Sequence, residues 1–258
     1  MHISLVWAFV DSFITERWWL LAITYIWSFV ISTVGHNVGL HRYFSHSSFK
    51  TTKRKHVFLA WFSILAGTLQ GPISYSSGHR HHHKYSDTPK DPHSPHQSGF
   101  WNIFFGIWSM RSDKEKEKIG PFAPARDLMR DPVIQSVEKH YFHVWYGATA
   151  LLFLISGIDA VVYFLYAPAG AWILLANAFN NCGGHYDYLP GSYRNFDLPD
   201  HSLNNPIINI VTPGEGYQNN HHQYPNSPNT AVTDKEWDFT YWVIKTFFEV
   251  KNNDTKTS

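Results

Sequence analysis

The sequence predicts an all-α integral membrane protein with about four transmembrane helices, the first of them short, and a helical cap on one side. Three observations predict this: long stretches without charged residues, an uneven distribution of lysine and arginine, and clusters of histidine beside the apolar stretches. Residues 18–40 contain no Asp, Glu, Lys or Arg. At about 1.5 Å per residue, a helix of this length crosses a bilayer core of about 30 Å.

Two of the apolar segments differ from ordinary spans. Residues 3–14 are apolar except for Asp11, and the segment is short for a complete crossing. Residues 57–77 are also free of charge, but basic segments flank them on both sides. We expect residues 57–77 to enter the membrane and return, or to lie along its surface, without crossing.

The last apolar stretch is expected to form a helical hairpin. Asp159 is its one charged residue, and it stands close to Gly157, which favours a turn. A soluble protein with several buried helices is the alternative, although uncharged runs this long seldom occur in soluble cores. The apolar segments in chain order are 3–14, 18–40, 57–77, 142–158 and 160–183.

Lysine and arginine indicate which side of the membrane each polar segment occupies. Arg17 precedes the first long run, and the other 20 of the 21 basic residues lie in 42–55, 80–139 and 194–256. The positive-inside rule then places those segments in the cytoplasm, with Arg17 and Asp159 on the opposite side. We therefore expect a single domain, residues 1–258, whose cytoplasmic cap comprises 41–56, 78–140 and 184–258.

The composition excludes several other functions. A net charge of +1 offers no electrostatic case for nucleic acid as a partner. The single cysteine, Cys182, excludes an internal disulfide framework and a cysteine-based zinc site. Histidine is the unusual residue, with 17 copies, many of them in tight clusters.

Three histidine clusters follow apolar blocks or a glycine-rich turn. Side chains at i, i+3 and i+4 share one helical face, so each triple can aim three side chains at one point. The histidines of HRYFSH are five apart, about 140° around a helix, and converge only near a helix end or bind two different metals. The clusters are His41/His46, His79/His82/His83 and Gln218/His221/His222, and a fourth contribution comes from Asn181/His185 in NNCGGH.

These side chains predict a site for two metal ions. Imidazole is a ligand for iron, copper, nickel and zinc, and a single zinc would use only three or four of them. The charge pattern independently places every cluster on the cytoplasmic side. His81, and also His2, His36, His56, His93, His96, His140, His143 and His201, are set aside as non-ligands, with His93 the first choice among these for a local role. The predicted ligands are His41, His46, His79, His82, His83, His185, His221 and His222.

The residue pattern favours a redox metal that activates oxygen. No E-x-x-H and no H-E-x-x-H occurs, so neither a carboxylate-rich di-iron bundle nor a zinc protease is indicated. A substrate beside a membrane is expected to be a lipid chain, which has no polarised bond for a Lewis acid to attack. Breaking an unactivated C–H bond needs an oxidising cofactor, and copper remains open beside iron at this stage.

The same residues carry a family resemblance over residues 35–248. The sequence resembles the membrane fatty-acyl desaturases of the Δ9 (stearoyl-type) group, and QGP at 70–72 is similar to the bacterial and cyanobacterial branch. The matching stretches are GLHRYFSH (39–46), QGPISYSSGHRHHHKYSDTPKDPH (70–93), GF (99–100), DLMRDP (127–132), NCGGH (181–185), GEGYQNNHH (214–222) and EWDFTYWVIK (236–245).

The resemblance implies a four-helix membrane scaffold with a cytoplasmic cap and two Fe²⁺ ions. It implies a cis double bond, expected at Δ9, put into a saturated acyl chain with dioxygen and two electrons, with no catalytic residue beyond the metal centre. The eight histidines match ligand positions, and Asn181 matches a residue that reaches the metal through water. The acyl carrier remains open among acyl-CoA, acyl-lipid and acyl-carrier protein, because Ser77–Gly78 lacks the charges of the animal acyl-CoA enzymes. Without a fused haem domain, the electrons are expected from a separate ferredoxin or cytochrome.

Gln218 departs from the family pattern, which usually has histidine there. Its carbonyl oxygen can replace the imidazole as a weaker, neutral ligand, or it can hold a water. The rival interpretation is a site altered in activity or specificity.

Two other functions stay in view. A membrane hydroxylase or ketolase acting on an alkyl or carotenoid chain would incorporate oxygen into its product. A non-catalytic, metal-handling membrane protein would place its ligands inside the spans, whereas here they lie just outside them.

Overall fold

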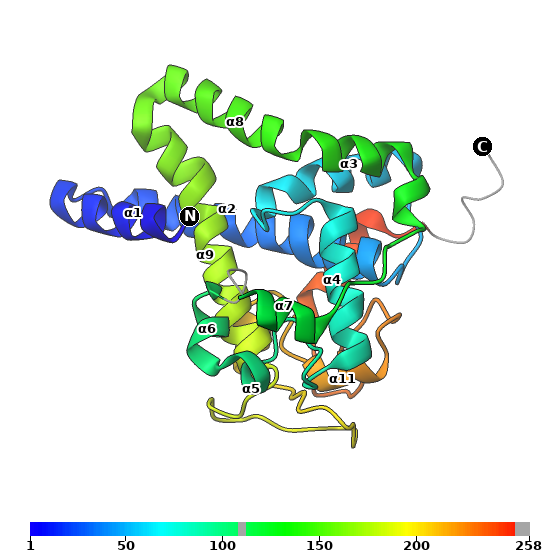
Figure 1. Cartoon of the computed structure of the whole chain (residues 1–258). Helices are drawn as coiled ribbons and strands as arrows, with labels where there is room; N and C mark the ends of the chain where they lie inside the picture. Colours follow the sequence, from blue (N-terminus) through cyan, green and yellow to red (C-terminus); the bar gives the residue numbers. More distant parts are fainter. Residues whose placement is uncertain (108–111, 251–258) are drawn as a thin grey trace.

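A computed structural model of the chain describes residues 1–107 and 112–250, and the regular secondary structure of those residues is almost entirely helical (Figure 1). Within this part, the only β-pairing consists of isolated bridges that join Asn204 to Tyr193 and to Tyr217. The helices are α1 (His2–Thr15), α2 (Trp18–Val30), η1 (Ile31–Ser45), α3 (Lys53–Phe62), η2 (Ser63–Ala66), α4 (Pro72–Tyr85), α5 (Pro95–Ser98), α6 (Phe100–Phe104), α7 (Asp113–Ile119), η4 (Leu128–Arg130), α8 (Pro132–Val161), η5 (Val162–Tyr166), α9 (Ala167–Leu175), η6 (Ala176–Gly183), α10 (Pro206–Val211), α11 (Gln218–Gln223), α12 (Phe239–Val243) and η7 (Ile244–Phe248).

In the described residues, two continuous helices are long and apolar enough to cross a membrane, by length and composition. The first, Trp18–Ser45, joins α2 to η1. The second, Pro132–Gly183, runs from α8 to η6 and bends at Ser156 and Gly157, whose backbone angles are not helical. The bend turns this segment into the expected hairpin. The expected count of four spans stays a prediction.

The tips of two hairpins meet at the end of the molecule that lies away from the histidines. Glu16, in the left-handed backbone region, turns the chain from α1 into α2. Arg17 then donates to Asp11 and to Asp159, each at 2.7 Å. The phenol of Tyr163 also donates to Asp11, at 2.7 Å. The charged residues of the two tips are therefore paired with one another.

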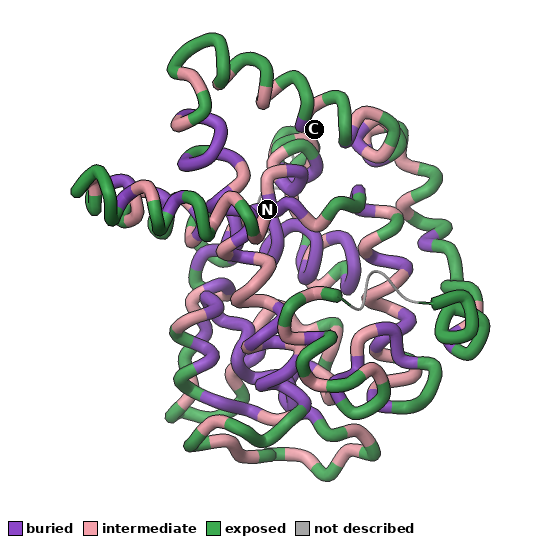
Figure 2. Tube along the Cα trace, turned by 60° about the vertical axis from the view of Figure 1, so that its left-hand side comes forward, coloured by how far each residue is buried: buried purple, intermediate pink, exposed green. Residues whose placement is uncertain are grey.

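The projecting arms, formed by α1 and by α8 near its bend, are largely exposed (Figure 2), and many of their exposed side chains are apolar. Ile3 of α1 is 84% exposed, and Leu154 of α8 is 82% exposed. Phe13 and Ile155 are also exposed. A contiguous apolar surface of this kind is typical of a helix that contacts lipid or another protein.

The segment at 57–77 is not one long helix. It begins in α3, tightens into η2, and breaks at Gly67 and Leu69, which have φ of 68° and 57°. Pro72 then starts α4, where its missing N–H is not needed. The break reverses the chain locally. Whether the segment lies in the membrane without crossing it stays a prediction.

Helix η1 occupies the centre of the fold. It contacts α2, α3, η2 and α4, and nearly all of its residues from Ile31 to Phe44 are buried. It is a π-helix, whose hydrogen bonds join residues five apart. This geometry positions the first histidine cluster.

Candidate metal centre

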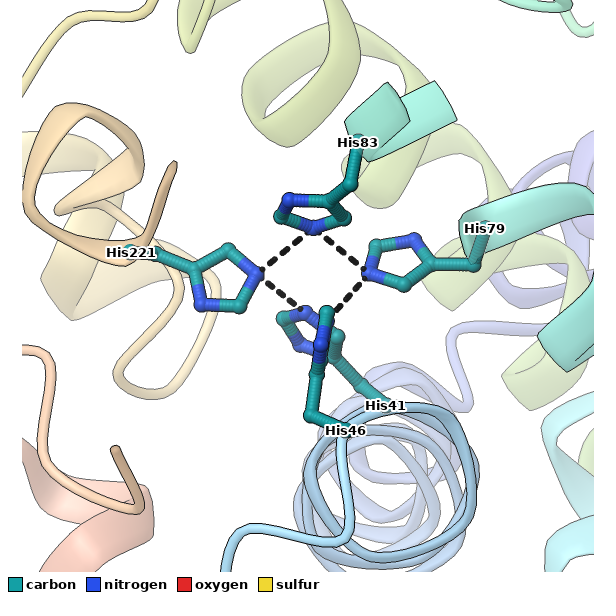
Figure 3. A group of neighbouring side chains, drawn as sticks. All are labelled: His41, His46, His79, His83 and His221. Carbon is teal, nitrogen blue, oxygen red and sulfur yellow. Dashed lines mark hydrogen bonds between the residues drawn. The ribbon is translucent and has the colours of Figure 1, made fainter. Parts of the chain in front are cut away.

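Five histidines converge on one point through their Nε2 atoms (Figure 3). The Nε2 of His41 lies 2.9 Å from that of His221, and the Nε2 of His221 lies 3.0 Å from that of His83. His79 lies 3.1 Å from His83 and 2.8 Å from His46, again between Nε2 atoms. We call these residues the five-histidine cluster.

A second group combines His82, His185 and His222, and we call it the three-histidine cluster. The ligand atoms within this group all lie within 4.8 Å of one another. Each ring is paired with a carboxylate through its Nδ1 atom. The pairs are His82–Asp91 at 2.9 Å, His185–Asp87 at 2.9 Å and His222–Asp200 at 2.7 Å.

The π-helical geometry explains how His41 and His46 meet despite their spacing. On an α-helix they would point about 140° apart. In η1 the i→i+5 hydrogen bonding brings residues five apart one turn apart, and η1 ends at Ser45, directly before His46. The two side chains therefore converge at a helix end. This was the first of the two alternatives drawn from their spacing, the second being that they bind different metals.

The triples do not aim at a single point, although their spacing allows it. His79 and His83 of α4 face the five-histidine cluster, whereas His82 faces the three-histidine cluster. Neighbours on an α-helix point about 100° apart, so a helix that lies between two sites serves both. His221 and His222 of α11 divide in the same way.

Burial keeps most of these rings neutral, which is the form that binds metal. Burial, together with the neighbouring histidines, lowers the pKa of His79, His83 and His221 well below the ordinary value. Burial also lowers the pKa of His222 to about 4, although its hydrogen bond to Asp200 acts in the opposite direction.

The contacts of the five-histidine cluster cannot all be hydrogen bonds. The rings form a chain of four Nε2···Nε2 contacts, and each Nε2 of a neutral ring carries either a proton or a lone pair. Each Nε2 therefore takes part in one linear hydrogen bond, so at most two of the four contacts are satisfied. A cation accepts all five lone pairs. Ligands at right angles on metal bonds of about 2.1 Å lie about 3.0 Å apart, close to the separations observed.

The three-histidine cluster fits a cation for a different reason. Each carboxylate accepts a proton from Nδ1, which leaves the lone pair of Nε2 free to bind a metal. The Nε2 atom of His222 is buried and has no hydrogen-bond partner. Burial alone would lower the pKa of His185, but the charge of Asp87 raises it, so this environment favours positive charge. Both donor sets therefore fit a metal ion.

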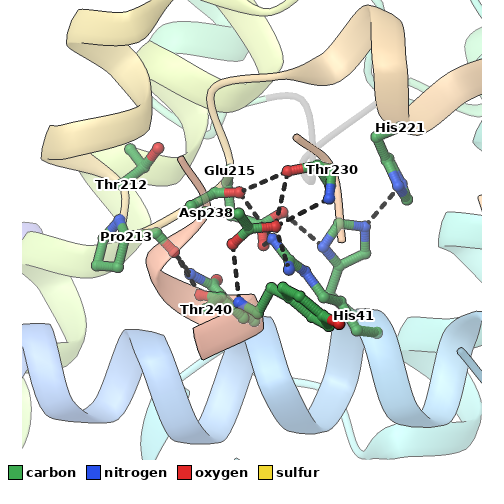
Figure 4. Close-up of polar contacts among 12 residues, drawn as sticks. His41, Thr212, Pro213, Glu215, His221, Thr230, Asp238 and Thr240 are labelled. Carbon is green, nitrogen blue, oxygen red and sulfur yellow. Dashed lines mark hydrogen bonds and ion pairs between the residues drawn. The ribbon is translucent and has the colours of Figure 1, made fainter. Parts of the chain in front are cut away.

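A buried ion-pair network contacts His41 on its Nδ1 side, away from the other histidines of its cluster (Figure 4). The Nδ1 atom of His41 lies 2.6 Å from Oε2 of Glu215. Arg42 donates to Oε1 of Glu215 at 3.1 Å, to Asp238 at 2.7 Å and to the carbonyl of Gly214 at 2.7 Å. Burial raises the pKa of Glu215 although Arg42 opposes the shift. The network ties the Gly214–Glu215 turn to η1.

A cavity of about 700 Å³ opens onto both clusters. His41 and His79 line it from the five-histidine cluster, and His82 and His185 from the three-histidine cluster. Its other walls are largely apolar and include Trp172, Ile173, Ala176 and Phe105. A cavity with this lining can hold an apolar ligand next to the metal-binding nitrogens.

The profile of the fatty acid desaturase family matches residues 16–234. The chain belongs to this family. It is 34% identical over 230 residues to a hex-5-enoyl-[acyl-carrier protein] acetylenase of Moorena producens, covering 83% of this chain and 70% of that protein. It is 29% identical over 248 residues to an sn-1 stearoyl-lipid 9-desaturase of Anabaena variabilis, covering 95% and 86%. An acyl-CoA C20 Delta5-desaturase of Anemone leveillei is 34% identical over 225 residues, covering 84% and 67%.

The match confirms the prediction of a fatty acid desaturase, an oxidoreductase of a membrane-bound family. The histidine clusters are consistent with a metal site typical of desaturases. These relatives do not assign the chain to the Δ9 subgroup, because their names also include 5-desaturases and an acetylenase.

The two amides expected near the desaturase metals line the cavity. Gln218 is buried, and its side-chain amide donates to the carbonyl of Glu215 at 2.9 Å. The amide of Asn181 donates to Asn177 at 3.0 Å. Their roles as a ligand and as a water-mediated ligand stay predictions.

Two of the histidines set aside behave differently. His93 stacks on His82 with ring centroids 4.1 Å apart, and His82, Asp91 and His93 form a further group of possible ligand atoms. His93 thus has a place beside the centre. His81 instead contacts the carbonyl of Lys90 at 3.0 Å.

Sequence reasoning missed four carboxylates that orient the desaturase histidines. Asp87 and Asp91 lie in the stretch 70–93, five and nine residues after His82. That spacing was the sequence signal that could have identified them as partners of the histidines. Glu215 is the acid of the GEG turn. Asp200 carries no local signal, since only the fold brings it to His222.

Proposed function

We propose that this protein is an oxygen-dependent fatty-acyl desaturase that introduces a cis double bond into a saturated acyl chain. Two iron ions would be held by the five-histidine and three-histidine clusters, with Gln218 and a water on Asn181 completing the second site. Bound iron would supply the oxidising power that breaks unactivated C–H bonds, which no side chain here can supply.

The observation that supports this proposal best is the cavity, because one largely apolar space is lined by histidines of both clusters. A saturated chain lying there passes beside both donor sets. Trp172 and Ile173 hold the chain and exclude water, and Tyr75 also lines the cavity, with its hydroxyl hydrogen-bonded to His36 at 2.8 Å. The protein's part is to position the chain and keep the site dry.

The carboxylates keep the metal-binding nitrogens available. Asp87, Asp91 and Asp200 accept the Nδ1 protons of the three-histidine cluster, so these protons stay away from the cavity. Together their three negative charges exceed the +2 charge of a divalent ion and so favour its binding. Imidazoles held in this way keep one tautomer and one orientation.

The electron balance requires an external reductant. Desaturation removes two hydrogens from the substrate, and reducing dioxygen to two waters takes two further electrons and two protons. We assign these electrons to a separate ferredoxin or cytochrome, and the active site to the cytoplasmic side. The proposed bond position is Δ9. The relatives' names divide between 9- and 5-desaturases, so product analysis decides the position.

The test is the fatty-acid profile of a desaturase-deficient host that expresses the chain, beside a His83→Ala control. We expect new cis-monoenes that disappear in the control, and the position of the double bond follows from their analysis. Unchanged lipids from protein that is in the membrane, loaded with iron and supplied with a reductase would overturn the proposal. A product that carries added oxygen would indicate the hydroxylase alternative.

A further inference from the structure

The opening of the cavity has an unusual chemical character. Four apolar side chains both line the cavity and are exposed: Leu69 (59%), Phe105 (46%), Ile107 (50%) and Phe122 (38%). A side chain that lines a cavity and also reaches the surface stands at its opening. Gln70, the exposed neighbour of Leu69, adds a neutral amide. The rim of the opening is thus apolar with one uncharged polar group.

The rim is hydrogen-bonded to α8, which belongs to a helix with the length and composition of a membrane span. The N–H of Leu69 donates to the hydroxyl of Tyr141 in α8 at 3.0 Å. Phe142 and Tyr146 of the same helix are exposed. Leu69 itself has φ of 57°, a left-handed conformation that non-glycine residues rarely adopt. The apolar side chain of Leu69 is thus exposed beside the exposed residues of α8.

The described lining of the cavity lacks lysine and arginine, the side chains that usually bind phosphate. Among the described residues that line the cavity, none is lysine or arginine, and the one carboxylate is the buried Glu215. Helix α7, which precedes Phe122, has three lysines and three acids and so no net charge. Within the described lining, the phosphates of coenzyme A or of a phosphopantetheine arm would find no lysine or arginine to bind.

The helix N-terminus nearest to Gln70 in the chain is already occupied by an anion. The N–H groups of Ile73 and Ser74, in the first turn of α4, donate to the carboxylate of Glu138 at 3.0 and 3.3 Å. The hydroxyl of Ser74 donates to the same carboxylate. A free N-terminus attracts phosphate, whereas one that carries a carboxylate repels it.

We propose that the acyl chain enters this cavity while it is still esterified to a membrane glycerolipid, and that it enters from the bilayer. The inference rests on the proposed function for the fate of the chain, but not for its binding. The apolar rim continues the bilayer interior up to the cavity. Gln70 can donate to an ester carbonyl there, and the headgroup stays outside in the interface.

The first test measures binding without turnover. Iron-loaded protein in phosphatidylglycerol vesicles is photolabelled with either a phosphatidylcholine or an acyl-CoA that carries the same diazirine-bearing stearoyl chain. We expect the phospholipid to label the segments around Leu69 and Trp172 at least about tenfold more strongly than the acyl-CoA does at equal concentration. Equal or stronger labelling by the acyl-CoA would overturn the proposal. Labelling by phospholipid without any desaturated product would refute the proposed function and leave the lipid route standing.

The second test changes the rim and keeps its backbone. Asp tolerates left-handed φ better than most residues do, so Leu69→Asp places a charge at the rim without new strain. We expect phospholipid labelling of the cavity to fall about fivefold or more, with iron content unchanged. The matched control is Ile210→Asp, an exposed apolar position on α10 away from the cavity lining. Unchanged labelling in Leu69→Asp, or an equal loss in Ile210→Asp, would contradict the proposal.

Discussion

The two histidine clusters present their imidazoles to a metal ion in different ways. In the five-histidine cluster the imidazoles crowd around one point, and a carboxylate contacts the Nδ1 of His41. In the three-histidine cluster every ring has its own aspartate. Five donors nearly complete the shell of a metal ion, whereas three leave positions open. We therefore infer that the five-histidine cluster mainly holds its metal ion, whereas the three-histidine cluster has the more reactive role.

The largest effect is expected from removing one of only three donors. His222→Ala leaves two imidazoles in the three-histidine cluster, too few to hold a metal tightly, so about half of the bound iron and all measurable desaturation should disappear. Iron per chain and product yield check this. His143→Ala, an exposed histidine on α8, is the matched control. Full iron content in His222→Ala would remove the distinction between the clusters.

Removing one of five donors should have a smaller effect. His46→Ala leaves four imidazoles in place, so we expect both irons to be retained and activity to fall by about 10- to 100-fold. The measurement is iron content beside the rate of product formation. If His46→Ala loses as much iron as His222→Ala does, the larger donor number gives no advantage.

The aspartates allow a finer test of the three-histidine cluster. In Asp87→Asn the amide oxygen can still accept the Nδ1 proton of His185, but the charge is lost, and we expect iron affinity to fall about 10- to 100-fold. A chelator competition measures this. Asp187→Asn, at an exposed aspartate two residues beyond His185, is the control and should change nothing. Equal affinities in both variants would mean that the carboxylate charge has no role.

The buried network behind His41 should affect stability more than metal binding. Asp238→Asn leaves the guanidinium of Arg42 with one carboxylate, Glu215, and we expect the free energy of unfolding to fall by about 3 kcal/mol. Thermal unfolding of the iron-free protein measures this, because no metal then contributes. A loss of iron without a loss of stability would assign the network to the metal site instead.

The smallest effect is expected at Gln218. It stands one turn before His222 on α11, so both side chains share a helix face. Gln218→His should add a stronger ligand to the three-histidine cluster and change the desaturation rate by no more than about threefold. The iron affinity of the variant, measured beside its product yield, checks this. Inactivation with full iron content would mean that the amide itself is needed.

Sequence reasoning identified the residues of the site better than their arrangement. All eight predicted histidines lie in the two clusters, because imidazoles beside apolar blocks are recognisable without a fold. Their division between clusters was not predictable from i, i+3, i+4 spacing. Adjacent residues such as His82 and His83 separate only when the helix stands between two sites. The four supporting carboxylates were missed because their partners are distant in sequence or lack a spacing rule, as with Asp200.

The sequence by itself determined the class of protein: apolar stretches predict helices for a membrane, and clustered imidazoles predict a metal site, since both depend on composition and local spacing. Only the tertiary structure decided which histidine joins which cluster, which carboxylate orients it, and that the cavity opens through an apolar rim beside α8. These features depend on the π-helical turn of η1 and on contacts between distant segments. Local patterns do not encode such contacts, because they form when the helices pack.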